Sequence, residues 1–208
     1  MTPTSPSSAE RRAQRQQNAR RQAQQQRLRR RLLRIGSGAG ALIVVGVVAW
    51  LIVGKPGLAS RTQAPAGVQI FSGLARTHTN DPVSYPETPP VGGPHAPVWQ
   101  NCGYYSAPIA NEHGVHSLEH GAVWITYQPN LPNDQVATLR QLADSQTYVL
   151  VSPYPNLPTP VVASAWGRQL RLDSVTDPRL VQFVSAFRQG PQTPERGAAC
   201  TGGTSVTQ

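Results

Sequence analysis

The chain has 208 residues and two cysteines, so it is too short for two large domains and too poor in cysteine for a dense disulfide scaffold or a four-cysteine zinc site. Its formal net charge of +9 is already present in residues 1–34, which hold ten arginines and one acidic residue, while from Lys55 onward nine basic residues balance nine acidic ones. This distribution excludes a uniformly basic globular protein, and with it the simplest class of nucleic-acid binder.

Residues 1–34 are predicted to be a disordered, basic cytoplasmic tail, because they are rich in Arg, Gln and Ala and form no apolar stripe that could be buried. Binding of anionic lipid is one interpretation of the arginines that directly precede the next segment, and a topology signal is the other. These arginines are Arg27, Arg29, Arg30, Arg31 and Arg34. Aromatic residues do not interleave with them, so no specific nucleic acid is expected as a partner.

Residues 35–54 are predicted to form a transmembrane signal-anchor helix. The nineteen residues 35–53 contain no ionisable side chain, and as a helix they would cover roughly 28 Å, about one hydrocarbon core. The arginines before them predict a single-pass protein of the cell membrane with a cytoplasmic N-terminus and an extracytoplasmic C-terminal domain. Residues 64–66 resemble a signal-peptide cleavage site, but the apolar segment is longer than that of a signal peptide, so an uncleaved anchor is expected.

The exported part is predicted to comprise a linker (55–67), one α+β domain (68–200) and a disordered C-terminal tail (201–208). Eighteen of the twenty prolines follow Lys55, and six of them lie within 77–99, which excludes a helix or a central strand from that long proline-rich region.

Four β-rich stretches and two helices are predicted after this region, which together indicate a small mixed sheet. The strands are expected at 123–127, 148–152, 161–166 and 169–172, the last two joined at Gly167. The first helix is expected to be N-capped by Asn133 or Asp134. The last is expected to be capped by Asp177 with Pro178 at its first position, and to bury the apolar stripe of Leu180, Phe183, Val184 and Phe187.

The two cysteines are predicted to form a disulfide, because an exported domain is exposed to oxidants. Cys102 and Cys200 would close a loop of nearly a hundred residues, which stabilises the fold by roughly 4–5 kcal/mol in the chain-entropy description. A redox-active pair would instead be expected in a close spacing such as C-x-x-C.

All five histidines lie between positions 78 and 120, which makes this segment the candidate site. His116 and His120 are four residues apart and would share one helix face, so they could bind one zinc or copper ion if residues 112–120 are helical. Asn111 as a cap and Gly121 as a terminator favour that helix, whereas Gly114 disfavours it. His95 and His78 are further candidate ligands, and a role in bracing the loops is the alternative for each.

The segment 116–120 also reads H-x-x-E-H, the signature of the inverted zinc peptidases, in which the glutamate activates a water molecule. Glu119 is therefore a candidate general base, and its alternatives are a carboxylate that orients an imidazole or a plain ion-pair acceptor. The required downstream acidic ligand is not evident, because Glu195 lies in a tail rich in Gly and Pro. A metal-assisted hydrolase is thus the weaker form of the metal hypothesis.

Three blocks of the sequence resemble the bacterial domain-of-unknown-function family 3105 over roughly residues 68–200. They are HTNDPVSYPETPPVGGPH (78–95), NCGYY (101–105) and VHSLEHGAVWITY (115–127). The resemblance implies a membrane or exported protein of unknown activity. The positions that match the family pattern are His78, Tyr85, His95, His116, Glu119 and His120; for Tyr85, binding an anion and packing in the core are both open.

Two functions follow as hypotheses. In the first, the histidines of the exported domain bind a zinc or copper ion. The domain then either holds the metal or uses it to assist hydrolysis. In the second, it is a non-catalytic envelope module that binds a protein or polymer, and the histidines and prolines only brace a rigid loop.

Overall fold

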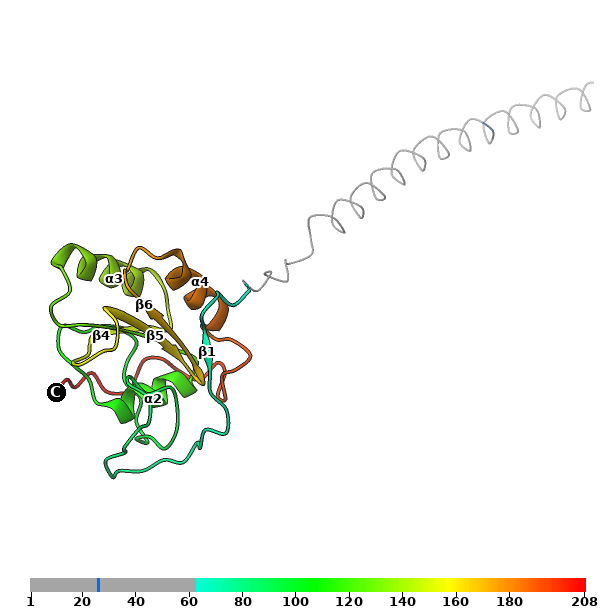
Figure 1. The fold of residues 1–208 in the computed structure, drawn as a ribbon. Coiled ribbons are helices and arrows are strands. Elements are labelled where there is room, and N and C mark those ends of the chain that lie inside the picture. Colours follow the sequence, from blue (N-terminus) through cyan, green and yellow to red (C-terminus); the bar gives the residue numbers. More distant parts are fainter. Residues whose placement is uncertain (1–25, 27–62) are drawn as a thin grey trace, which may run out of the picture. The chain divides into compact units, whose positions relative to one another are not determined.

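The β-rich stretches pair into one six-stranded sheet in the computed structural model, which describes residue 26 and residues 63–208 (Figure 1). The strands are β1 (Gln69–Ile70), β2 (Gly103–Tyr104), β3 (Val123–Tyr127), β4 (Val149–Pro153), β5 (Val161–Ala165) and β6 (Arg168–Leu172), and their spatial order is β1-β6-β5-β3-β4-β2. β4 is parallel to β3 and β2, whereas β3, β5 and β6 pair antiparallel. The predicted α+β class with a mixed sheet is confirmed, and two short edge strands are added to it.

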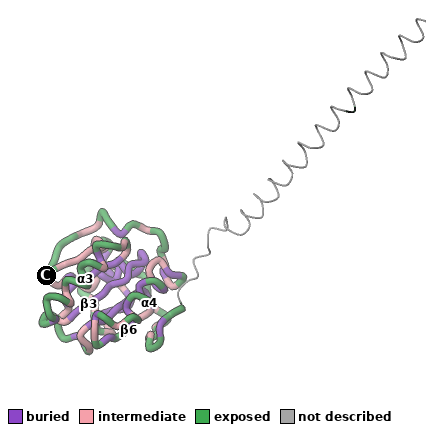
Figure 2. The backbone as a smooth tube through the Cα atoms, turned by 90° about the horizontal axis from the view of Figure 1, so that it is seen from above, coloured by how far each residue is buried: buried purple, intermediate pink, exposed green. Residues whose placement is uncertain are grey.

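The two faces of the sheet bury different sets of side chains because successive residues of a strand point to opposite sides. Val123, Ile125 and Tyr127 pack with α3 (Asn133–Ser145) and α4 (Pro178–Phe187), which cover one face in Figure 1. Trp124 lies on the other face, with Leu118 of α2 (Asn111–Glu119). In Figure 2 the buried stretches gather in the interior of the domain and the exposed ones lie around them. α2 thus reaches the sheet from the face that the last two helices leave open.

Three helices are present among the described residues, where two were expected, since the conditional helix around 112–120 forms as α2. Asp177 caps α4 as predicted, and its side chain accepts a hydrogen bond from the backbone N–H of Arg179. The expected caps of α2 and α3 are wrong: Asn111 and Asn133 are already helical, and the residues before them, Ala110 and Pro132, make no side-chain cap bond.

The packing of α2 against the sheet explains why a glycine, Gly114, lies within this helix. A Cβ atom on Gly114 would lie 2.7 Å from the Trp124 ring, which is closer than real contacts allow. The absence of a side chain therefore lets α2 lie directly on β3. Gly121, with φ of +99°, ends the helix in the left-handed region as expected, and this turn sends the chain into β3.

The predictions for the N-terminal part fall largely outside the described residues. The basic tail, the helix at 35–54 and most of the linker are not among them. Within the part of the chain that the structure does describe, no helix is long and apolar enough to cross a membrane.

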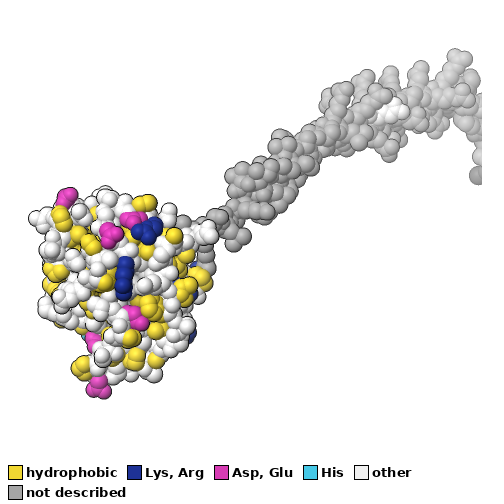
Figure 3. Space-filling model, viewed as in Figure 1, with side chains coloured by type: hydrophobic (Ala, Val, Ile, Leu, Met, Phe, Trp, Pro, Cys, Tyr) yellow, Lys and Arg dark blue, Asp and Glu magenta, His cyan; other side chains and the backbone are white. Residues whose placement is uncertain are grey.

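Other described regions bear on two further expectations. Residues 77–99 contain only an isolated bridge and no helix, as their prolines predict. Residues 201–208, expected to be disordered, are hydrogen-bonded to the domain, since Thr204 pairs with Gln100 and the Gln208 N–H donates to the Pro108 carbonyl. The charged side chains visible in Figure 3 are sparse and of both signs, in keeping with the balanced charge of this half.

Candidate metal centre

Two segments that are separate in sequence bring four of the five histidines together. His116 and His120 lie on one face of the end of α2, with Glu119 between them. His78 and His95 come from the proline-rich region and form an isolated parallel bridge. Two backbone hydrogen bonds fix that bridge, from the Thr79 N–H to the His95 carbonyl (2.8 Å) and from the His95 N–H to the Thr77 carbonyl (3.0 Å).

The imidazoles of His78, His95 and His116 form a triangle in which every pair of ring centroids is 4.9 Å apart. The carboxylate of Glu119 lies beside this triangle, with its Oε2 atom 2.9 Å from His95 Nε2 and 4.0 Å from His78 Nε2. His95, His116 and Glu119 are almost completely buried, whereas the side chain of His78 is 48% exposed. Only one member of the triangle therefore meets solvent.

The orientation of each buried imidazole is fixed by a backbone carbonyl at Nδ1. The three contacts are His95 with Gly93 (2.7 Å), His116 with Ala96 (2.6 Å) and His120 with Ala199 (2.6 Å). A carbonyl oxygen can only accept, so each Nδ1 carries the hydrogen, and in a neutral ring the lone pair is then on Nε2. Histidine ligands of metal ions are held in this way, by donating the other ring N–H to a carbonyl or carboxylate.

Burial favours the neutral form of His116, the histidine at the centre of the cluster. Its pKa is lowered from 6.5 to about 4, chiefly by desolvation. The hydrogen bond to Ala96 opposes this shift, and the nearby rings of His120, His95 and His78 add to it. A metal ion binds the neutral ring, so the environment keeps His116 in its ligating form at neutral pH.

The lowered pKa of His116 predicts acid destabilisation of the metal-free chain. Because the unfolded chain binds this proton near pH 6.5 and the folded chain only near pH 4, the contribution is fully present above pH 6.5 and is lost as the pH falls towards 4. In the presence of a chelator, we expect the Tm to fall over this window and to fall less steeply for His116→Asn. Equal pH slopes for the two proteins would refute the assignment.

Tyr85 supports the loop that carries His95. Its hydroxyl donates a 2.6 Å hydrogen bond to the Pro94 carbonyl, and its ring lies next to Gly93, whose own carbonyl holds His95. Burial, together with the nearby Glu112 and Tyr154, raises the pKa of Tyr85, so the hydroxyl stays a neutral donor. The sequence leaves both anion binding and core packing open for Tyr85, and this geometry corresponds to packing.

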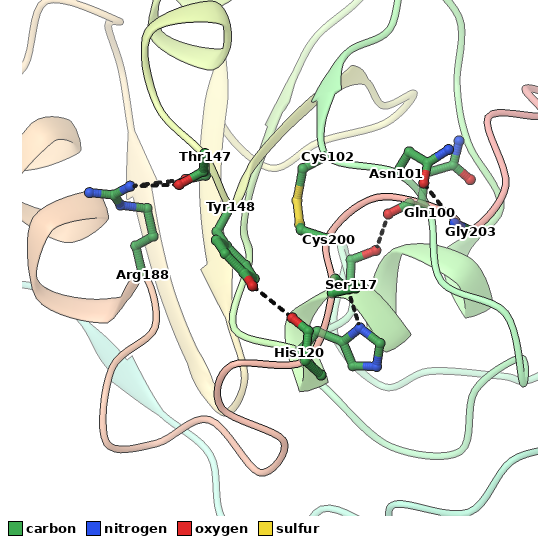
Figure 4. Close-up of a disulfide and its surroundings, with 12 residues drawn as sticks. Gln100, Asn101, Cys102, Ser117, His120, Thr147, Tyr148, Arg188, Cys200 and Gly203 are labelled. Carbon is green, nitrogen blue, oxygen red and sulfur yellow. Dashed lines mark hydrogen bonds between the residues drawn. A yellow bond between two sulfur atoms is a disulfide. The ribbon is translucent and has the colours of Figure 1, made fainter.

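Glu195 is the residue of the site that sequence reasoning set aside. Its Oε2 atom lies 3.4 Å from His120 Nε2, and its backbone N–H donates to the Glu119 carbonyl at 3.0 Å. The expected disulfide, which is confirmed, lies just beyond: Cys102 and Cys200 are bonded, and Cys200 follows Ala199, the acceptor of the His120 Nδ1–H. Figure 4 shows the disulfide with His120 and with Tyr148, whose hydroxyl donates to the Ala198 carbonyl.

The donor atoms fall into two groups that share His116. In one group, the ligand atoms of His78, His95, His116 and Glu119 lie within 4.8 Å of one another, and the same limit holds for His116, His120 and Glu195 in the other. Neighbouring ligands of a tetrahedral zinc ion are about 3.3 Å apart, as Zn–N bonds of about 2.0–2.1 Å require. Closing either group around an ion therefore needs side-chain shifts of about 1 Å or less.

The remaining candidates lie outside both groups. His113 is only partly buried, and its Nδ1 atom donates to the Val98 carbonyl at 2.5 Å. Trp99 packs its ring against His120, with centroids 4.8 Å apart, so it forms a wall of the site. Trp124 and Trp166 are buried core residues.

Comparison with known proteins gives one match. The model of a family described as "Protein of unknown function (DUF3105)" matches residues 76–202, a span that contains both donor groups and both cysteines. No curated protein and no solved structure is significantly similar to the chain.

Proposed function

The chain belongs to the DUF3105 family, whose description states no activity, and on that premise we propose that its folded domain binds a first-row transition metal ion. The ligands are His78, His95, His116 and Glu119, which offer three imidazole nitrogens and one carboxylate oxygen. Imidazole ligands suit zinc and copper, so the ion is Zn²⁺ or Cu²⁺.

One observation carries this proposal: buried imidazoles are locked by backbone carbonyls so that their Nε2 atoms point into a common space. A loop-bracing histidine needs only one ring nitrogen for its hydrogen bond and leaves the other free to face solvent. Here the second nitrogen of His95 instead lies 2.9 Å from the buried carboxylate of Glu119, and that of His116 lies 3.0 Å from His120 Nε2. With Nδ1 already donating, a neutral His95 brings its Nε2 lone pair against a carboxylate oxygen, and a bound cation relieves that repulsion.

Four protein ligands make this a site for holding an ion rather than for hydrolysis. A catalytic zinc ion keeps one coordination position open for water or substrate, whereas a closed set of four is typical of structural sites. In this arrangement Glu119 binds the ion and is not available as a general base. The proposal therefore favours metal binding over the hydrolase that the H-x-x-E-H pattern suggests.

The domain is proposed to act outside the cytoplasm, anchored by residues 35–54. The support is the uncharged stretch at 35–53 with its flanking arginines, together with the disulfide, which is typical of exported domains. Cell fractionation tests this: the protein should be recovered with the membrane, with its C-terminal half open to external protease. Recovery in the soluble fraction would contradict it.

The metal proposal is tested by the stability and metal content of the full chain in detergent. After dialysis against Zn²⁺ or Cu²⁺ we expect about one tightly held ion per chain, and the Tm should rise because the ion binds only the folded state. Ca²⁺, which prefers oxygen ligands, should have no effect. His95→Asn keeps a donor for the Gly93 carbonyl and removes Nε2, so it should lose most of the Tm shift.

The alternative of a non-catalytic module with bracing histidines predicts a different result. The same variant would then lose stability without any dependence on metal, and the wild type would bind less than a stoichiometric amount of Zn²⁺ and Cu²⁺. That outcome would reject the metal proposal.

A further inference from the structure

A second feature of the cluster is not used by the four-ligand site: a close contact between the ring nitrogens of His116 and His120. Their Nε2 atoms are 3.0 Å apart. Both rings already donate Nδ1–H to backbone carbonyls, of Ala96 and Ala199. Two neutral rings in that tautomer would point lone pairs at each other, which is repulsive. A proton shared by the two nitrogens or a metal ion bound to both removes that repulsion.

An acidic side chain stands at the same place. The Glu195 Oε2 atom is 3.4 Å from His120 Nε2, and the Glu119 carbonyl holds the Glu195 backbone. Two imidazoles and one carboxylate with an open fourth position are an accepted ligand set for zinc. Trp99 covers one side of the His120 ring, which leaves Glu195 as the solvent-facing member of the set.

The carboxylates of the two donor groups differ in their access to solvent, although His78 gives the first group an exposed member as well. The Glu119 side chain is 2% exposed, whereas that of Glu195 is 52% exposed. His116 belongs to both groups, and its Nε2 atom has one lone pair, so it can bind only one ion at a time. The two positions are therefore alternatives for one ion rather than a pair that fills together.

We propose that His116, His120 and Glu195 form a second position for the metal ion, and that its exposed carboxylate gives the ion a route to and from the four-ligand position. The ion first binds Glu195 and His120, and His116 then passes it to Glu119, His95 and His78 by exchanging one set of partners for the other. This inference rests on the proposed metal function and adds a route of exchange to it.

The test measures rates rather than affinity. The full chain is loaded with Zn²⁺, and both uptake and release to an excess of chelator are followed by stopped flow with a chromophoric zinc indicator. Glu195→Gln removes the exposed carboxylate of the second position and leaves His78, His95, His116 and Glu119 in place. We expect about tenfold slower uptake and release with a nearly unchanged amount of bound zinc.

The matched control is Asp144→Asn, which removes another exposed carboxylate, on α3, that belongs to neither group. It should exchange zinc at the wild-type rate, so that a general effect of surface charge is separated from a ligand effect. If Glu195→Gln also exchanges at the wild-type rate, the second position is rejected while the metal function stands. If the wild type binds no zinc, both proposals fail.

His120→Asn provides an independent check. It keeps the donor for Ala199 and removes the other ligand of the exposed position, so it should slow exchange as Glu195→Gln does. The double variant should be little slower than either single one, because both changes block the same step. Fully multiplicative effects would mean that the two residues act separately, which contradicts the proposal.

Discussion

Replacement of His116 by asparagine is expected to abolish stoichiometric metal binding by the full chain. His116 is the one residue common to both donor groups, so its loss leaves neither complete. Asparagine keeps an N–H close to the position of Nδ1, which preserves the hydrogen bond to the Ala96 carbonyl and limits damage to the fold. The affinity for Zn²⁺, measured by competition with a chelator, should fall by more than about 100-fold. Loss of a residue that only orients a ligand lowers the affinity by no more than that.

His113→Asn is the matched control for this prediction. His113 lies one turn earlier on α2, and its Nδ1 atom also donates to a backbone carbonyl, that of Val98, but it belongs to neither donor group. The control should bind zinc as the wild type does. Equal losses in the two variants would mean that disturbing α2, rather than removing a ligand, is responsible.

Removal of the disulfide is expected to cause the largest loss of stability. The bond joins residues 98 positions apart, and in the chain-entropy description a loop of that length stabilises the folded state by about 4–5 kcal/mol. The paired variant Cys102→Ser/Cys200→Ser should therefore unfold at a markedly lower guanidinium concentration, as followed by near-UV circular dichroism. Backbone bonds such as Cys102 N–H to the Cys200 carbonyl (2.8 Å) should preserve the fold of the variant in water.

The same variant should affect the two metal positions unequally. Ala199, which orients His120, is next to Cys200, whereas His78 and His95 are held by the proline-rich region. The variant should therefore alter the rate of zinc exchange more than it alters the amount of zinc bound. A free energy of unfolding within about 1 kcal/mol of the wild type would show that the disulfide constrains the unfolded chain far less than its loop length implies.

Much of the fold was predictable because its signals are local. β3 and the stripe of α4 follow from alternation and from helical spacing of apolar residues, and both match the structure. The helix starts were less predictable: Asn133 is a good capping residue, yet α3 begins one residue earlier, directly after Pro132. Capping preference is small, about 1 kcal/mol, so packing of the helix against the sheet decides where it begins.

The candidate site was predictable only in part, for a similar reason. The spacing of His116 and His120 indicates a shared helix face, and α2 provides it. The pairing of His78 with His95 has no periodic signal, because it depends on one isolated bridge between irregular segments. Glu195 lies in a loop rich in Gly and Pro, which gives no local signal of a ligand, but long-range contacts, including its bond to the Glu119 carbonyl, bring that loop to the histidines. The resemblance to DUF3105 identified the domain and not its chemistry.

X-ray absorption spectroscopy of the zinc-loaded full chain tests the central claim most directly. We predict four nitrogen or oxygen ligands at about 2.0–2.1 Å, with the outer-shell scattering of imidazole rings, and loss of that scattering in His116→Asn. A spectrum of hydrated zinc with oxygen ligands alone, or an imidazole signal that His116→Asn leaves unchanged, would contradict a metal centre at this histidine cluster.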